Sequence, residues 1–348
     1  MRIAGKKPSG RSANREGPGR RWFFTTVALT AMSWANPELT IQRTEAEVGP
    51  NGENGGFTAR FIDVNGVRTR YYDEGSGDPM VLVHGSGFSG TASANTWSLN
   101  IAGMAEHFHV YAPDKLASGM TGNPESDDDL NIRGEVQHMV DFVKALGLEK
   151  IHLVGQSRGG GLAFQFTVTH PELVRTLVIV DSATASPPAG DDRPNRRRRL
   201  FTGCAPLPEG FKCQQSALYY DPSPVSEDFV NAAAFMKDQP KARETERRNT
   251  DALRQRNRVI TSEMNHDAYH RILTEGILQM PVLLYWAQND PSVLPMQAYS
   301  FFNIIAETNP NVRLVFTNRG GHFHYREQPE EFVHNVTSFV NYWSAKGY

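Results

Sequence analysis

Hydrophobic positions along the chain alternate between short, mostly apolar runs and longer segments with helical spacing. The apolar runs are Met80–Val83, Phe108–Ala112, Ile151–Val154, Leu177–Val180, Val282–Trp286 and Val312–Phe316. Between them, Leu130–Leu146 has apolar residues three and four positions apart and stops before Gly147, as an amphipathic helix does. Strands that are apolar throughout are typical of a mostly parallel sheet covered by helices on both faces.

Two segments depart from this alternation. Phe57–Val64 and Val67–Tyr72 are rich in strand-forming residues and flank Asn65-Gly66, which predicts a hairpin. A later stretch contains Arg196–Arg199 and helix-rich polar sequence, with no buried strand until Pro281. We therefore predict an α/β core at residues 57–185 and 277–348, with a helical cap at 186–276 over the carboxyl edge of the sheet, where ligands of such sheets bind.

The amino-terminal residues lie outside this pattern. Scattered basic residues end at Arg20-Arg21, and a mostly apolar run follows as far as Trp34. This order predicts an export signal at residues 1–35 of the twin-arginine kind, which implies a periplasmic or secreted protein. A cytoplasmic protein with a basic arm is the alternative. Residues 36–56 are polar and end in the glycine-rich stretch Pro50–Gly56, which predicts a linker.

Composition and charge narrow the class of protein. The 348 residues are 39% hydrophobic and 21% charged, enough apolar material for a sizeable core. A net charge of −2 gives no electrostatic footprint for nucleic acid, and no run approaches the roughly 20 apolar residues of a membrane span. The only cysteines, Cys204 and Cys213, exclude a disulfide scaffold but could pair in an oxidising compartment. We expect a soluble globular enzyme.

A candidate nucleophile follows the third apolar run, in Gly155-Gln156-Ser157-Arg158-Gly159. A G-x-S-x-G motif between a strand and a helix holds the serine hydroxyl above the sheet on a sharp turn. Glycines two positions before and after Ser157 let the backbone pass without clashes. The amino end of the following helix directs unpaired N–H groups at developing negative charge.

A serine nucleophile needs a base and an acid that orients the base, and in this topology both follow the serine along the chain. Asp290 follows the Val282–Trp286 run, and His322 follows the last run in Gly320-Gly321-His322. Asp181 is the reserve acid. His324 follows the same strand as His322, but the paired glycines favour His322 because they let its loop fold tightly. We predict a triad of Ser157, His322 and Asp290.

The predicted oxyanion hole combines two backbone N–H groups. One belongs to Arg158, the residue after the nucleophile, and the other to Ser86 in His84-Gly85-Ser86-Gly87, directly after the first apolar run. His84 is fixed within this loop, so we expect it to be a structural hydrogen-bonding residue and not a base.

Together, these motifs identify the chain as a member of the α/β-hydrolase superfamily across residues 57–348. Within it, the chain resembles the meta-cleavage-product hydrolases, which cut carbon–carbon bonds in ring-opened aromatic compounds. The resemblance rests on the His84–Ser89 loop, Gly159–Gly161 and the cap stretch Leu218–Glu227. It implies no cofactor and no metal, and it implies substrate contacts at Gly85, Gly87, Phe88, Asn95, Gln156 and Phe323.

The chain also departs from that group. Phe88 replaces a proline, Gln156 an asparagine, and Phe323 a tryptophan. The cap arginine that grips the oxo-acid end of those substrates aligns near Ala233. Arg196–Arg199 could substitute for it, but such a run is more typical of a solvated helix face.

These departures favour a cofactor-free serine hydrolase acting on a neutral carboxylic ester or lactone, because an apolar lid offers no partner to a carboxylate. The alternative is a carbon–carbon bond hydrolase of ring-fission products (vinylogous diketones). A perhydrolase and a ligand-binding receptor on the same fold remain further alternatives. The expected partner is a small-molecule substrate, with no nucleic acid and no membrane span, and a homodimer is left open.

Overall fold

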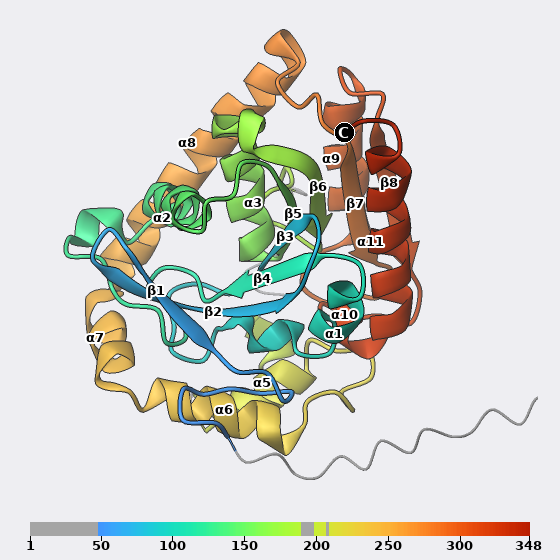
Figure 1. Cartoon of the computed structure of the whole chain (residues 1–348). Coiled ribbons are helices and arrows are strands. Elements are labelled where there is room, and N and C mark those ends of the chain that lie inside the picture. Colours follow the sequence, from blue (N-terminus) through green and yellow to red (C-terminus); the bar gives the residue numbers. More distant parts are fainter. Residues whose placement is uncertain (1–47, 189–197, 207–208) are drawn as a thin grey trace, which may run out of the picture. The chain divides into compact units, whose positions relative to one another are not determined.

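The computed structural model describes residues 48–188, 198–206 and 209–348. These residues form a single mixed sheet with helices packed on it (Figure 1). In these ranges eight strands lie in the order β1-β2-β4-β3-β5-β6-β7-β8. They are β1 (Arg60–Val64), β2 (Val67–Gly75), β3 (Pro79–Val83), β4 (His109–Pro113), β5 (Ile151–Gln156), β6 (Val174–Val180), β7 (Val282–Ala287) and β8 (Val312–Thr317). Each predicted strand is present, with its ends shifted by a few residues.

The first strands are antiparallel and the others parallel. β1 and β2 form the predicted hairpin, with Val64 opposite Val67 across Asn65-Gly66, both of which have positive φ. β2 also pairs antiparallel with β4, and the strands from β4 through β8 run parallel. The carboxyl ends of β3 to β8 therefore meet along one edge of the sheet, which is the edge where the predicted site residues follow the strands.

Helices cover both faces, which explains why the parallel strands are mostly apolar. Leu177, Ile179 and Leu284 face a core shared with α2 (Ile132–Ala145), α3 (Arg158–Thr169) and α9 (Pro295–Ala306). Alternate residues such as Val178 and Leu283 face a second core with α1 (Ile101–Ala105) and α11 (Pro329–Ser344). A wholly buried side chain such as Leu284 contributes enough that truncation to alanine costs about 2–5 kcal/mol. No helix in the described ranges is long and apolar enough to cross a membrane.

The segment between β6 and β7 is helical, as predicted, but only its first part is separate from the core. It contains α5 (Phe211–Ser216), α6 (Glu227–Lys237), α7 (Pro240–Arg248) and α8 (Asp251–Glu275). Near the end of α8, Ala268 and Ile272 are fully buried in the core beside α3 and α9. This part of α8 therefore packs on the helices that cover the sheet, and the cap boundary at residue 276 stays a prediction.

The predicted linker, residues 36–56, is described only in part. Its described end, residues 48–56, packs onto the sheet. The Gly52 carbonyl accepts hydrogen bonds from Arg70 and Asn95, and the Glu53 carboxylate accepts the N–H groups of Asn51 and Ala59. Burial tends to raise the pKa of Glu53, but these hydrogen bonds outweigh it and lower the pKa. The rest of the linker and the predicted export signal lie outside the described residues.

Candidate active site

The predicted nucleophile lies on a sharp turn between β5 and α3. Ser157 has φ 53° and ψ −121°, a strained backbone conformation. A side-chain carbon at Gly155 would overlap the Gly159 carbonyl, and one at Gly159 would overlap the carbonyls that end β3. The two outer glycines of the motif are thus required by close backbone approach.

Two side chains that the sequence analysis missed hold this turn in place. The hydroxyls of Ser182 and Thr184 donate to the Ser157 carbonyl at 2.5 and 3.0 Å. They approach closely because side chains at Gly160 and Gly161 would overlap Ser182 and Thr184. Glycine at both positions therefore leaves room for the loop after β6. The signal in the sequence is the small polar run directly after the Leu177–Val180 strand.

The structure brings the three predicted triad side chains into one chain of hydrogen bonds. His322 Nε2 lies 3.0 Å from Ser157 Oγ, and His322 Nδ1 lies 2.7 Å from Asp290 Oδ2. The other oxygen of Asp290 accepts the backbone N–H groups of Ser292 and Val293. Asp290 is therefore fixed as an acceptor, which assigns Nδ1 of His322 as the protonated nitrogen and leaves Nε2 free to accept the serine proton.

The reserve acid and the competing histidine lie beside the triad but outside it. Asp181 and His324 are both buried, and their closest atoms are 3.2 Å apart. Burial and the neighbouring Asp290 carboxylate raise the pKa of Asp181 well above its usual range. Burial lowers the pKa of His324 to about 3. Neither residue makes a hydrogen bond to Ser157, so the geometry favours Asp290 and His322.

The predicted oxyanion hole has two unpaired backbone N–H groups, one from Ser86 in the loop after β3 and one from Arg158 at the start of α3. Ser86 has φ 64°, an uncommon conformation for a residue with a side chain, and is exposed to solvent. Among the described residues, no acceptor is hydrogen-bonded to the backbone N–H of Ser86 or of Arg158. Both groups are thus available to stabilise an oxyanion next to Ser157.

A buried ion pair holds the Ser86 carbonyl of this loop in place. Lys115 Nζ donates to the Ser86 carbonyl at 2.8 Å and to Glu135 Oε1 at 2.9 Å, and both charged side chains are almost fully buried. His84 Nε2 accepts the Lys115 backbone N–H, and its Nδ1 lies 2.8 Å from the Gly85 carbonyl. Burial, and then the Lys115 charge, lower the pKa of His84 well below its usual range. His84 is therefore a neutral hydrogen-bonding residue, as predicted.

Two of the expected substrate contacts are buried and hydrogen-bonded to other parts of the protein. Asn95 is buried, and its side chain is occupied by Arg70, Tyr72 and the Gly52 carbonyl. Gln156 has no exposed surface and donates to the His322 carbonyl at 3.0 Å. Both therefore stabilise the protein around the site, and their assignment as substrate contacts stays a prediction. The motif spacing cannot reveal this, because a buried and an exposed amide look alike in a sequence.

The other expected contacts divide in the same way. Gly85 is buried, and Phe88 packs into a hydrophobic cluster with Leu116 and Leu253, away from solvent. Only Gly87 and Phe323 are partly exposed. These two remain candidates for substrate contact.

The short helix α10 (His324–Glu327) ties the base loop to the cap, and the sequence analysis missed this role. The Glu327 carboxylate accepts backbone N–H groups from Gly321, Tyr220 and Asp221. The buried Arg326 guanidinium donates to the carbonyls of Asn95, Thr96 and Pro224.

Gly321 explains why the base loop contains glycine. Its α-carbon lies so close to Leu218 and Tyr220 of the cap that a side chain would overlap their backbone. The His322 backbone N–H donates to the Leu218 carbonyl at 2.8 Å. The glycine therefore allows the cap to approach the base loop, whereas the sequence analysis expected it to let the loop fold over the serine.

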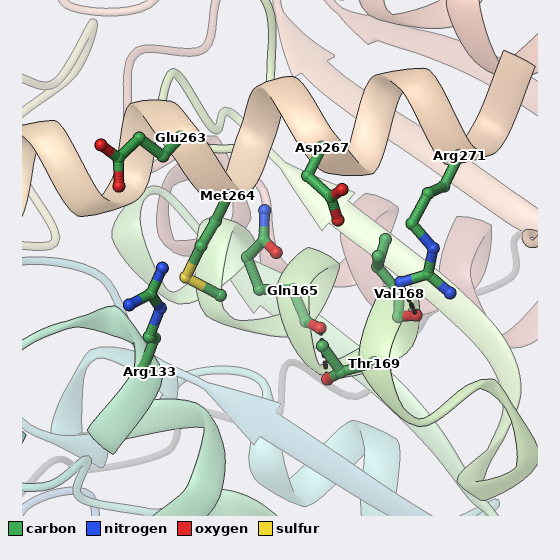
Figure 2. A pocket seen from close by; sticks show the side chains of 8 residues that line it. All are labelled: Arg133, Gln165, Val168, Thr169, Glu263, Met264, Asp267 and Arg271. Atoms are coloured by element: carbon green, nitrogen blue, oxygen red, sulfur yellow. Dashed lines mark hydrogen bonds between the residues drawn. The ribbon is translucent and has the colours of Figure 1, made fainter.

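A groove of about 400 Å³ lies elsewhere, between α8 and the pair formed by α2 and α3 (Figure 2). Its lining includes Arg133, Gln165, Asp267 and Arg271, and none of the predicted site residues. The groove is therefore separate from the chemistry at Ser157.

Comparison with known proteins agrees with this geometry. The α/β-hydrolase fold family matches residues 78–329. The 2-hydroxy-6-oxo-6-(2'-aminophenyl)hexa-2,4-dienoic acid hydrolase of Metapseudomonas resinovorans is 27% identical over 82% of this chain and 91% of its own. The 2-hydroxy-6-oxo-2,4-heptadienoate hydrolase of Pseudomonas putida F1 is 28% identical over 81% of this chain and 95% of its own. A solved structure of the meta-cleavage product hydrolase CumD from Pseudomonas fluorescens IP01 has a TM-score of 0.64, with 25% identity over 83% of this chain and 99% of that one.

Proposed function

The chain belongs to the α/β-hydrolase fold family, and we propose that it hydrolyses the carbon–carbon bond beside the 6-oxo group of a ring-fission dienoate. The observation that supports this most is the similarity to dienoate hydrolases over more than nine-tenths of their length. This reverses the preference drawn from the sequence, where the neutral ester came first and carbon–carbon cleavage second. The earlier preference gave most weight to the absent cap arginine, which is a single contact, whereas the similarity extends over most of the chain.

In this proposal Ser157 and His322 supply the proton transfer. The histidine accepts a proton either from Ser157 as it attacks the 6-oxo carbon, or from a water molecule that attacks instead. Asp290 stabilises the imidazolium that forms, through the 2.7 Å contact with Nδ1. The backbone N–H groups of Ser86 and Arg158 stabilise the negative charge on the former oxo oxygen.

Collapse of the tetrahedral intermediate then breaks the bond between carbons 5 and 6. The bond breaks in the 2-oxo tautomer, in which the proton of the 2-hydroxyl has moved to carbon 5. The electron pair then passes through carbons 4 and 3 to the 2-oxo oxygen, which is protonated. Carbon 6 ends as a carboxylic acid, directly after attack by water or through an ester of Ser157 that water hydrolyses. Water supplies the added hydroxyl and proton. Carbon 5 is a better leaving group in this tautomer than in a simple ketone, because its charge is delocalised onto the 2-oxo oxygen.

The test compares two substrate classes on one preparation. We expect kcat/KM for 2-hydroxy-6-oxo-2,4-heptadienoate to exceed that for p-nitrophenyl acetate, with Ser157→Ala inactive on both. Loss of dienoate absorbance and release of nitrophenolate measure the two rates. A clear preference for the ester would return the chain to the carboxylic ester hydrolases, a class that the uncharged Ala233 of the cap also fits.

We also propose that the protein is exported. Cys204 and Cys213 form a disulfide in the cap, and disulfides persist in oxidising compartments. Together with the twin-arginine pattern before residue 35, this supports a periplasmic or secreted location.

A further inference from the structure

The proposed substrates are acids, which sets a requirement on the site. A dienoate carboxyl is ionised at neutral pH. An ionised carboxylate that enters a partly buried site without a partner is strongly disfavoured, whereas a planar guanidinium can bind it through two hydrogen bonds. A site for such a substrate therefore needs an uncommitted cation near Ser157.

Most cations around the site are already committed. Lys115 is held by Glu135 and the Ser86 carbonyl, and Arg326 donates to several backbone carbonyls. Lys241 of α7 donates to the Gly119 carbonyl at 3.0 Å. In the cap, Ala233 packs against Phe211 and Phe229 and carries no charge.

Arg158 is different. It directly follows Ser157 as the first residue of α3 and is partly exposed. A side-chain carbon at Gly87 would lie 3.4 Å from its Nε, so the guanidinium lies against the oxyanion loop. Nε is shielded from solvent, and the side chain makes no hydrogen bond or ion pair with any other residue in the described ranges. A shielded donor without an acceptor is costly unless a ligand supplies one.

We propose that the Arg158 side chain binds the substrate carboxylate and replaces the cap arginine that this chain lacks. This inference rests on the proposed function. Carbons 2 to 5 separate the carboxyl carbon from the 6-oxo carbon, a span similar to an extended arginine side chain. One residue then serves both ends of the substrate. Its backbone N–H faces the oxyanion, and its guanidinium holds the acid.

The test measures a ratio, kcat/KM for the heptadienoate divided by kcat/KM for p-nitrophenyl acetate. We expect Arg158→Met to lower this ratio about 10- to 100-fold, as expected for loss of a charge-assisted contact. Arg158→Lys should recover part of it, because lysine keeps the charge but loses bidentate geometry. The matched control is Arg133→Met, an exposed arginine of α2 in the separate groove of Figure 2, which should leave the ratio unchanged.

Two other results would overturn this inference or the proposed function. If Arg158→Met lowers both rates equally, the side chain only positions the backbone, and the inference is overturned. A wild-type enzyme that fails to cleave the dienoate overturns the proposed function instead, and this inference with it. If Arg158→Met does not fold, the test is made by inhibition of the wild type and of Arg158→Lys.

In the wild type, benzoate should inhibit ester hydrolysis competitively and more strongly than benzyl alcohol. In Arg158→Lys, inhibition by benzoate should be weaker, and inhibition by benzyl alcohol should be unchanged. Equal inhibition by the two compounds would contradict the proposal.

Discussion

Asp181 Oδ2 lies 3.2 Å from His324 Nε2, so the two residues that compete with the triad in the sequence are paired with each other. The two atoms are not aligned for a hydrogen bond, although both side chains are buried. Burial raises the pKa of Asp181 well above its usual range and lowers the pKa of His324 to about 3, so it disfavours the charged form of each side chain. A second Asp–His pair thus lies beside the triad without contacting Ser157.

The triad assignment predicts a sharp contrast between the two histidines. Ser157→Ala and His322→Ala should each lower kcat by about a millionfold, because the two residues act as one unit. His324→Ala should reduce activity mildly, since its ring does not reach the serine. Steady-state kinetics on the preferred substrate measure all three variants. A larger loss for His324→Ala than for His322→Ala would show that the base is misassigned.

The buried Asp181 predicts a pH-dependent stability difference. Its folded-state pKa is raised above the unfolded value of about 4, so its contribution to stability is complete below that pH and is lost as the pH rises towards the folded pKa. The side chain of Asp181→Asn cannot ionise, so the variant does not lose this stability as the pH rises. Relative to wild type, the variant should therefore gain stability between pH 4.5 and pH 8, as measured by urea unfolding.

Activity provides the control for that variant. Asp181→Asn should keep most of the turnover, whereas Asp290→Asn should lose about 10⁴-fold through the wrong histidine tautomer. A comparable loss in Asp181→Asn would transfer the role of orienting acid to that residue.

The Lys115–Glu135 pair predicts separate effects on stability and on turnover. Lys115→Met leaves a buried carboxylate without its partner and should cost about 3–5 kcal/mol. Adding Glu135→Leu should restore much of the stability, because an apolar pair can replace a buried ion pair. In both variants kcat should be lower than in the wild type, by up to about 100-fold, because the Ser86 carbonyl has lost the Lys115 donor. Denaturant unfolding and kcat together check this, and full recovery of kcat in the double variant would exclude a role in positioning the oxyanion loop.

The cap disulfide predicts dependence on redox conditions. Replacing Cys204 and Cys213 by serine should lower stability by about 2–3 kcal/mol, the loop-closure value for a ring of this size. Urea unfolding of the variant, compared with wild type before and after reduction, measures the difference. Free thiols in the native protein would contradict the pairing.

The proposed export predicts cleavage of the amino-terminal signal and dependence on its paired arginines. The mature protein should begin at Asn36, and changing Arg20 and Arg21 to lysine should block export. Amino-terminal sequencing of the native protein checks the first point and cell fractionation the second. An intact Met1 on the mature protein would rule out cleavage of a signal at this site.

The sequence by itself determined the parallel core and the identity of the triad. Mostly apolar strands are typical of a sheet between two layers of helices, and the G-x-S-x-G turn, Asp290 and His322 each follow such a strand. Parallel strands place their carboxyl ends at one edge, so spacing along the chain was enough to bring these residues together.

Only the tertiary structure decided which polar residues face the substrate and which support the site. Asn95 and Gln156 match a substrate-binding pattern, yet packing buries them among residues distant in the chain. Lys115, Glu135 and Arg326 carry no motif, and their roles arise from carbonyls and carboxylates that folding brings within 3 Å. Burial and hydrogen-bond partners are properties of the packed chain, because they depend on contacts between segments whose separation in the sequence sets no spacing rule.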